Sequence, residues 1–139
     1  MSNISLAYKF TGENFKHLEY LMGNIKESLE EKNHKIFCSL FLENEFQNEG
    51  LSSDEIYTRC ANEQEYYDNI IYVLDSNQRS KGMEIELEKA IEYGQKQFII
   101  NRAGVFRPNF YHGVSEVITF QKYDKLFDIL KKNNNFKYI

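Results

Sequence analysis

Hydrophobic and polar residues alternate along the chain in two kinds of segment. Short runs rich in β-branched and aromatic residues are typical of strands, and longer segments whose apolar residues recur every three to four positions are typical of amphipathic helices. The run Ile70-Ile71-Tyr72-Val73-Leu74 is apolar without interruption, which favours a strand covered on both faces. The short runs predict strands over residues 4–10, 35–41, 69–75, 97–101 and 116–120.

The segments between these strands predict four helices. Ser52 and Glu55 have the spacing of a capping box, in which each side chain satisfies a free backbone N–H at a helix start. Gly94 stands where a helix would end in the left-handed conformation that glycine tolerates. The predicted helices cover residues 15 to about 33, 52 to about 66, 81–93 and 122–132.

Strands separated by helices must pair in parallel, through right-handed crossovers. The order of elements therefore predicts an α/β fold, a five-stranded doubly wound parallel sheet with flavodoxin-like order 2-1-3-4-5 and three α/β/α layers. A length of 139 residues suits one domain over residues 1–139, and we expect the tail Asn133 to Asn135 to fray.

Composition narrows the range of partners. The net charge of −4 is small, and the basic residues are scattered, which argues against a nucleic acid polymer or a membrane as partner. Cys38 and Cys60 lie in apolar stretches and are expected to be buried free thiols of a cytoplasmic protein. The three histidines match no metal-binding spacing, and nothing in the sequence calls for a cofactor.

In a doubly wound sheet, ligands bind beyond the carboxyl ends of the strands where the strand order reverses. Here the loops after the first and third strands, 10–13 and 75–82, should meet at that point. The second loop leads into a helix N-terminus flanked by Arg79 and Lys81, an arrangement that favours a phosphate. Arg102 and Arg107, after the fourth strand, would either complete this phosphate site or brace a loop.

Glu86 is the main candidate for chemistry. The helix over 81–93 should bury one face, and Glu84 and Glu86 lie at opposite margins of that face, so periodicity does not choose between them. Glu86 stands one turn before the small residue Ala90, and a partly desolvated carboxylate there would suit a nucleophile or a general acid or base. The expected buried face consists of Met83, Leu87, Ala90, Ile91 and Gly94.

The stretch from Asp68 to Lys96 resembles the nucleoside 2-deoxyribosyltransferase superfamily, which includes the 2'-deoxynucleoside 5'-monophosphate N-hydrolases. Its signature is an acidic residue that opens strand three, followed after that strand by Ser-x-Gly-x-x-x-Glu-x-x-x-Ala and a glycine-containing turn. The matching residues are Asp68, Ser80, Gly82, Glu86, Ala90 and Gly94.

The resemblance implies an N-glycosidase, or a transferase, that acts on a nucleoside 5'-monophosphate. Glu86 would attack the anomeric carbon to form a covalent ribosyl-enzyme, which water or another base resolves. Ser80 would contact the 5'-phosphate, and the loop after strand one would line the base and sugar pocket. The resemblance further implies a homodimer. The predicted substrate-binding residues are Phe10, Thr11, Gly12, Arg79, Ser80 and Gly82.

One position departs from the family pattern. The family usually has an aspartate eight residues before the position of Asp68, where it helps to protonate the leaving base, and this chain has Cys60. Asp75, at the end of the third strand, is the predicted substitute and the second predicted catalytic residue.

Two other functions remain open. A TIR-like domain that cleaves NAD would use a glutamate on the corresponding helix, although the Trp-Cys pair that often precedes it is absent. A nucleotide-binding module without catalytic activity is the other reading, and Cys60 is the argument for it.

Overall fold

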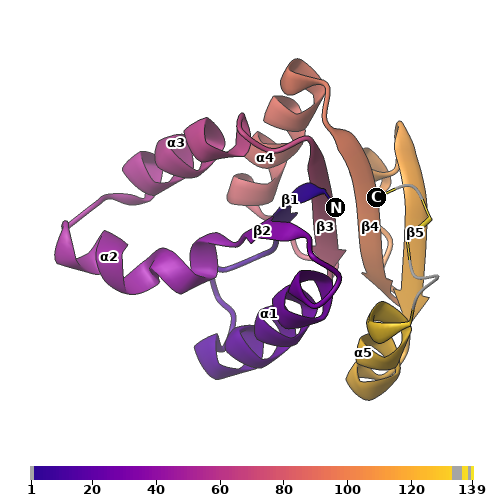
Figure 1. Cartoon of the computed structure of the whole chain (residues 1–139). Coiled ribbons are helices and arrows are strands. Elements are labelled where there is room, and N and C mark those ends of the chain that lie inside the picture. Colours follow the sequence, from indigo (N-terminus) through magenta and orange to yellow (C-terminus); the bar gives the residue numbers. More distant parts are fainter. Residues whose placement is uncertain (1, 133–135, 138) are drawn as a thin grey trace.

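The computed structural model describes residues 2–132, 136, 137 and 139. Its centre is a sheet of five parallel strands in the order β2-β1-β3-β4-β5, as predicted (Figure 1). The order reverses at β1 and β3, whose register pairs Ile4 with Asn69 and Ala7 with Tyr72. The strands are β1 (Asn3–Ala7), β2 (Lys35–Phe37), β3 (Asn69–Leu74), β4 (Lys96–Arg102) and β5 (Val114–Phe120).

Helices lie on both faces of the sheet, which gives the three predicted layers. One apolar core packs α1 and α5 against alternate strand residues such as Ile71, Val73 and Ile100. The second core packs α4 and the segment around Phe110 against the intervening residues, among them Tyr72. The helices are α1 (Phe15–Glu30), α2 (Glu43–Asn48), α3 (Ser53–Gln64), α4 (Lys81–Tyr93) and α5 (Tyr123–Lys131), with 3-10 turns η1 (Ser39–Leu42) and η2 (Pro108–Phe110).

The local signals at the ends of α3 and α4 are confirmed. Ser52 Oγ accepts from the N–H of Glu55, and the Glu55 carboxylate accepts from the N–H of Ser52, which is the predicted capping box. Gly94 ends α4 with φ of 67°, in the left-handed region that glycine enters without strain. The capping box fixes where α3 begins and Gly94 fixes where α4 ends, and these two helices flank the candidate site.

The prediction of a strand over 35–41 is wrong for its second half. β2 ends at Phe37, and the chain then forms η1 and the short helix α2, which the sequence analysis did not predict. A short apolar run such as Phe37 to Leu42 fits a strand and a buried helical turn equally well. In the structure Leu40 turns into the core beside α1, and Tyr8 Oη and Ser39 Oγ lie in hydrogen-bond contact at 3.0 Å.

The predicted core face of α4 is wrong at Ile91, which is 66% exposed, and at Gly94, which is also exposed where it ends the helix. Met83 and Ala90 are buried, and Leu87 packs against them. Met83, Glu86, Leu87 and Ala90 occupy helical positions i, i+3, i+4 and i+7 and form one stripe along the helix. Ile91, the residue after Ala90, points away from that stripe. The tail at 133–135, where we expected fraying, lies outside the described residues.

Candidate active site

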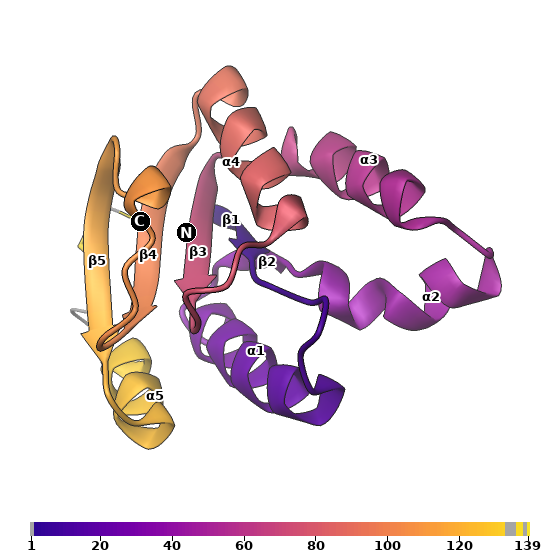
Figure 2. The same cartoon turned by 180° about the vertical axis from the view of Figure 1, so that it is seen from behind.

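A cavity of about 550 Å³ opens beyond the carboxyl end of β1, on the side of the sheet where α3 and α4 lie. Figure 2 shows the segments around it: the loop after β1, the short helix α2, α3 and the N-terminal end of α4. The lining residues are Tyr8, Lys9, Phe10, Thr11, Gly12, Ser39, Glu43, Phe46, Ser53, Ile56, Tyr57, Cys60, Gln78, Arg79, Ser80, Lys81, Gly82 and Glu86.

The structure brings together the predicted nucleophile and all six predicted binding residues. Glu86 lines this cavity with the others, which come from the two loops expected to meet at the reversal of strand order. The six are Phe10, Thr11, Gly12, Arg79, Ser80 and Gly82. Because these residues line one cavity, one ligand can contact all of them. The role of each residue toward that ligand stays a prediction.

Glu86 is half-buried, and burial raises the pKa of its carboxyl to about 8. Within the described part of the chain no group donates a hydrogen bond to this carboxylate. Gln64 Nε2 does donate to Glu86, but to its backbone oxygen, at 2.9 Å. Glu84, the alternative carboxylate, is held outside by Arg79 through bonds of 2.8 and 3.0 Å. Glu86 is therefore the acidic group of α4 that is free to meet a ligand in the cavity.

The charge of the Glu86 carboxylate acts on four protonated side chains, of which Tyr8 and Cys60 line the cavity with it. Burial, with a further contribution from the charge of Glu86, raises the pKa of Cys60 to about 11 and that of Tyr72 well above its ordinary value. The pKa values of Tyr8 and Cys38 are also raised, first by burial. None of these four groups supplies a positive charge, so an ionised Glu86 gains no charge stabilisation from them.

The N-terminus of α4 forms one edge of the cavity. Ser80 caps the helix by accepting from the N–H of Met83 at 3.2 Å, and the first N–H groups of the helix have no partner within it. A Cβ on Gly82 would lie 3.2 Å from the Tyr57 ring, so a larger residue would crowd this wall of the cavity. These features suit an anion approaching the helix end.

Three cations stand at the same edge, each paired with a carboxylate. Lys9 contacts Glu13 at 3.2 Å, Arg79 contacts Glu84 at 2.8 Å and Lys81 contacts Asp54 at 3.3 Å. Arg79 and Lys81 are largely exposed, so exchange of their partners for a ligand phosphate costs little.

Asp75 does not line the Glu86 cavity. Residues of β3 alternate between the two faces of the sheet, and Asp75 follows Leu74 onto the side where α1 and α5 lie. There it accepts from Arg102 Nε at 2.7 Å and from Tyr123 Oη at 3.0 Å, and contacts His17 Nε2 at 3.3 Å.

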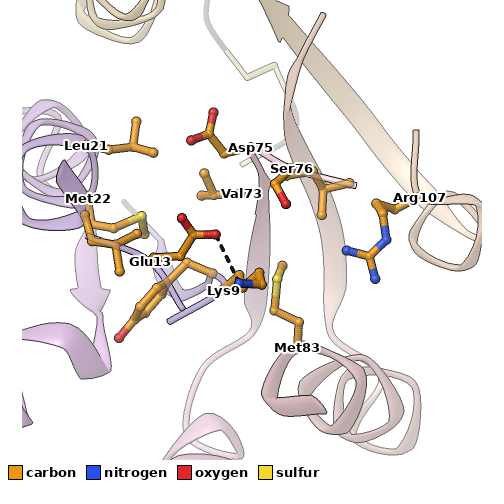
Figure 3. A pocket seen from close by; sticks show the side chains of 12 residues that line it. Lys9, Glu13, Leu21, Met22, Val73, Asp75, Ser76, Met83 and Arg107 are labelled. Carbon is orange, nitrogen blue, oxygen red and sulfur yellow. Dashed lines mark hydrogen bonds and ion pairs between the residues drawn. The ribbon is translucent and has the colours of Figure 1, made fainter. Parts of the chain in front are cut away.

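The described structure thus separates the two predicted catalytic residues. Asp75 lines a much smaller space, of about 20 Å³, in which Lys9 and Glu13 form their ion pair (Figure 3). That volume holds about one water molecule. Arg107 also lines this space and donates to the carbonyl of Gln78, which braces the loop before α4.

Replacing Asp75 by Asn is expected to lower the free energy of unfolding by about 1 to 2 kcal/mol, because the Arg102 guanidinium loses its charged acceptor. Urea denaturation measures this loss. If Asp75 only orders this edge of the sheet, the N-glycosidase activity expected from the sequence should stay within about threefold of wild type in the variant. A loss of turnover without a loss of stability would instead support the catalytic role predicted from the sequence.

The part that η1, α2 and α3 take in the wall of the cavity was not predicted from the sequence. Ser39, Glu43, Phe46 and Tyr57 all line the cavity. In a parallel sheet the loops that follow the strands all open at the same edge. The loop after β2 therefore lies beside those after β1 and β3, and this was the signal by which its part in the site could have been predicted. The strand predicted to continue through residue 41 hid it.

Comparison with solved structures identifies the fold. The CMP N-glycosidase BcmB of Clostridium botulinum has a TM-score of 0.65 and 15% identity over 92% of this chain and 96% of that one. A 2-deoxyribosyltransferase of Bacillus psychrosaccharolyticus has a TM-score of 0.64 and 15% identity over 91% of each chain. The chain shares the fold of these two enzymes. This agrees with the resemblance drawn from the residues between Asp68 and Lys96.

The same fold also occurs with another activity. A putative quinone reductase from Klebsiella pneumoniae has a TM-score of 0.56 and 11% identity over 94% of this chain and 83% of that one. No family model matches the sequence, and no curated protein matches it. Function must therefore be argued from the site.

Two further properties bear on the site. Among the residues that the structure describes, no three His, Cys, Asp or Glu side chains gather in a way that could hold a metal ion. No helix in the described ranges has the length and apolar character needed to cross a bilayer.

Proposed function

We propose that the protein belongs to the nucleoside 2-deoxyribosyltransferase superfamily and cleaves the N-glycosidic bond of a nucleoside 5'-monophosphate. Glu86 is the nucleophile, and water or a second base resolves the ribosyl-enzyme. The observation that carries this proposal is the Glu86 carboxylate, half-buried and without a hydrogen-bond donor, at the wall of a cavity whose edge is a helix N-terminus. The names of the two glycosyl-cleaving enzymes with the same fold add support.

The argument for a monophosphate rests on the edge of the cavity. A 5'-phosphate placed at the start of α4 would accept from the free N–H groups and replace Glu84 and Asp54 as the partner of Arg79 and Lys81. Ser80 already caps the helix through its hydroxyl oxygen, and its O–H proton is available to the phosphate. The sugar then lies between this edge and Glu86.

The chemistry follows from that placement. As the bond from C1' to the base nitrogen breaks, positive charge develops on the sugar ring, and an ionised Glu86 next to it forms the new bond to C1'. The burial that disfavours ionised Glu86 also makes it a stronger nucleophile once the developing positive charge is beside it. No cofactor takes part in this scheme.

The test is chromatography of the purified protein incubated with ribo- and deoxyribonucleoside monophosphates, the matching nucleosides and NAD. Free base released from monophosphates, and lost in Glu86→Gln, is the expected result. Release of nicotinamide from NAD alone would replace the proposal by the TIR-like function. Saturable binding without turnover would identify a silent binding module.

The resemblance also predicts a homodimer, which sedimentation of the purified chain checks. A dimer would be consistent with the proposal, and a monomer that releases base would show that one chain carries a complete site.

A further inference from the structure

The cavity contains a second carboxylate. Glu43 is the first residue of α2 and lines the cavity opposite α4, together with Ser39 and Phe46. Glu43 and Cys60 of α3 line the same cavity, and the charge of Glu43 contributes to the raised pKa of that thiol. Burial raises the pKa of Glu43 itself. Two carboxyl groups therefore line one cavity from different elements, as a glycosidic cleavage requires.

Cleavage of an N-glycosidic bond needs a proton as well as a nucleophile. A neutral purine or pyrimidine leaves as an anion unless a ring nitrogen or carbonyl oxygen receives a proton in the transition state. A useful donor has a pKa close to the working pH. Cys60, with a pKa of about 11, and Tyr8, with a pKa raised by burial, hold their protons too tightly. Glu43 is the lining carboxyl that remains once Glu86 is assigned as nucleophile.

We propose that Glu43 is the catalytic residue that protonates the leaving base, an inference that rests on the proposed function. The Glu43 proton passes to the base as the electron pair of the C1'–N bond moves to that nitrogen. Glu86 forms the bond to C1' in the same step. In the second step water attacks C1', loses its proton to Glu43 and releases Glu86, which restores both carboxyl groups.

The protonation states of the neighbouring groups are compatible with this assignment. Between the pKa of Glu43 and that of Glu86 the pair holds one proton, which rests mainly on Glu86. The reactive arrangement is the less populated one, with that proton on Glu43 and Glu86 ionised. The cavity's cations are in ion pairs, and its thiol and the surrounding phenols have raised pKa values, as described above. The groups that line the cavity with the pair are Tyr8 and Lys9 after β1, Ser39 after β2, Tyr57 and Cys60 on α3, and Arg79 and Lys81 at α4. Cys38 and Tyr72 lie in the adjoining cores, and the charge of Glu86 contributes to their raised pKa values.

The test compares Glu43→Gln with Glu45→Gln, a matched change at an exposed position of the same helix. Both are assayed on the monophosphate that wild type cleaves best and on nucleotides whose base is already cationic, such as nicotinamide mononucleotide and 7-methylguanosine 5'-monophosphate. We expect Glu43→Gln to lower kcat about 10²- to 10⁴-fold on the neutral base and less than about threefold on a cationic base, which needs no proton to leave.

The pH profile supplies a second readout that does not depend on acceptance of cationic bases. Wild-type kcat/KM should fall above about pH 8, where the pair loses its last proton, and Glu43→Gln should lose this fall. Activity of Glu43→Gln within threefold of Glu45→Gln, or an unchanged fall of kcat/KM at alkaline pH, would overturn the role of Glu43 and leave the proposed function intact. Absence of base release by wild type from every monophosphate would overturn the proposed function and this inference with it.

Discussion

Glu86→Gln is expected to reduce base release from a nucleoside monophosphate by at least about 10³-fold, with little change in KM. The amide has the size of the carboxyl group but forms no bond to C1', so the covalent step is lost while the cavity keeps its shape. The buried surroundings of Glu86 need no compensating change, since the described residues offer it no hydrogen-bond donor that the amide would forfeit. Single-turnover assays with excess enzyme measure the loss directly.

Glu88→Gln is the matched control for this experiment. Glu88 lies on the same helix, two residues away, with its side chain exposed to solvent outside the cavity. Its replacement should leave kcat and KM unchanged within about twofold. Equal activity of the two variants would show that the carboxylate of Glu86 does not form the covalent bond.

The same Glu86→Gln substitution is expected to stabilise the protein at alkaline pH by about 2 to 4 kcal/mol. In the unfolded chain this carboxyl ionises near its ordinary pKa of 4.5, whereas burial keeps it protonated in the folded protein up to about pH 8. The folded state therefore binds more protons over that window, and its stability falls as the pH rises through it. Glutamine does not titrate, so the variant escapes this loss.

Urea denaturation of wild type and Glu86→Gln at half-unit steps from pH 4 to pH 9 measures the effect. The two free energies of unfolding should agree near pH 4, separate progressively above it and differ by a constant amount beyond about pH 8. Glu88→Gln should follow wild type throughout. A difference that is already complete at pH 4 would mean that packing, and not ionisation, separates wild type from the variant.

The sheet and most helices were predictable because their signals are local. The uninterrupted apolar run of β3 and the alternation of strands and helices predicted the order of the sheet, and the caps at Ser52 and Gly94 fixed two helix ends. Ile91 shows the limit of this reasoning. An apolar residue at the margin of a helical stripe is buried or exposed according to where neighbouring elements lie, which the sequence of one helix does not contain.

The candidate site was predictable on one side of the cavity only. The loops around Thr11 and Ser80 follow from the reversal of strand order, and the resemblance placed Glu86 beside them. Glu43 was missed because the apolar run before it was predicted as a strand, which hid η1 and the short helix α2 that begins at Glu43. Asp75 was placed at the correct edge of the sheet, yet on the opposite face, because its side chain follows the alternation of β3.

The early end of β2 divides the lining of the cavity between two parts of the chain. Glu86 and the phosphate-facing edge belong to α4, which is anchored to the central strands by Met83 and Ala90. The opposite wall, residues 39–60, is a peripheral excursion between β2 and β3. Under the proposed function, changes of sequence or length in this excursion would alter which base is accepted without moving the nucleophile. Because the excursion also carries Glu43, a graft of it between relatives would transfer base preference and the proposed proton donor together.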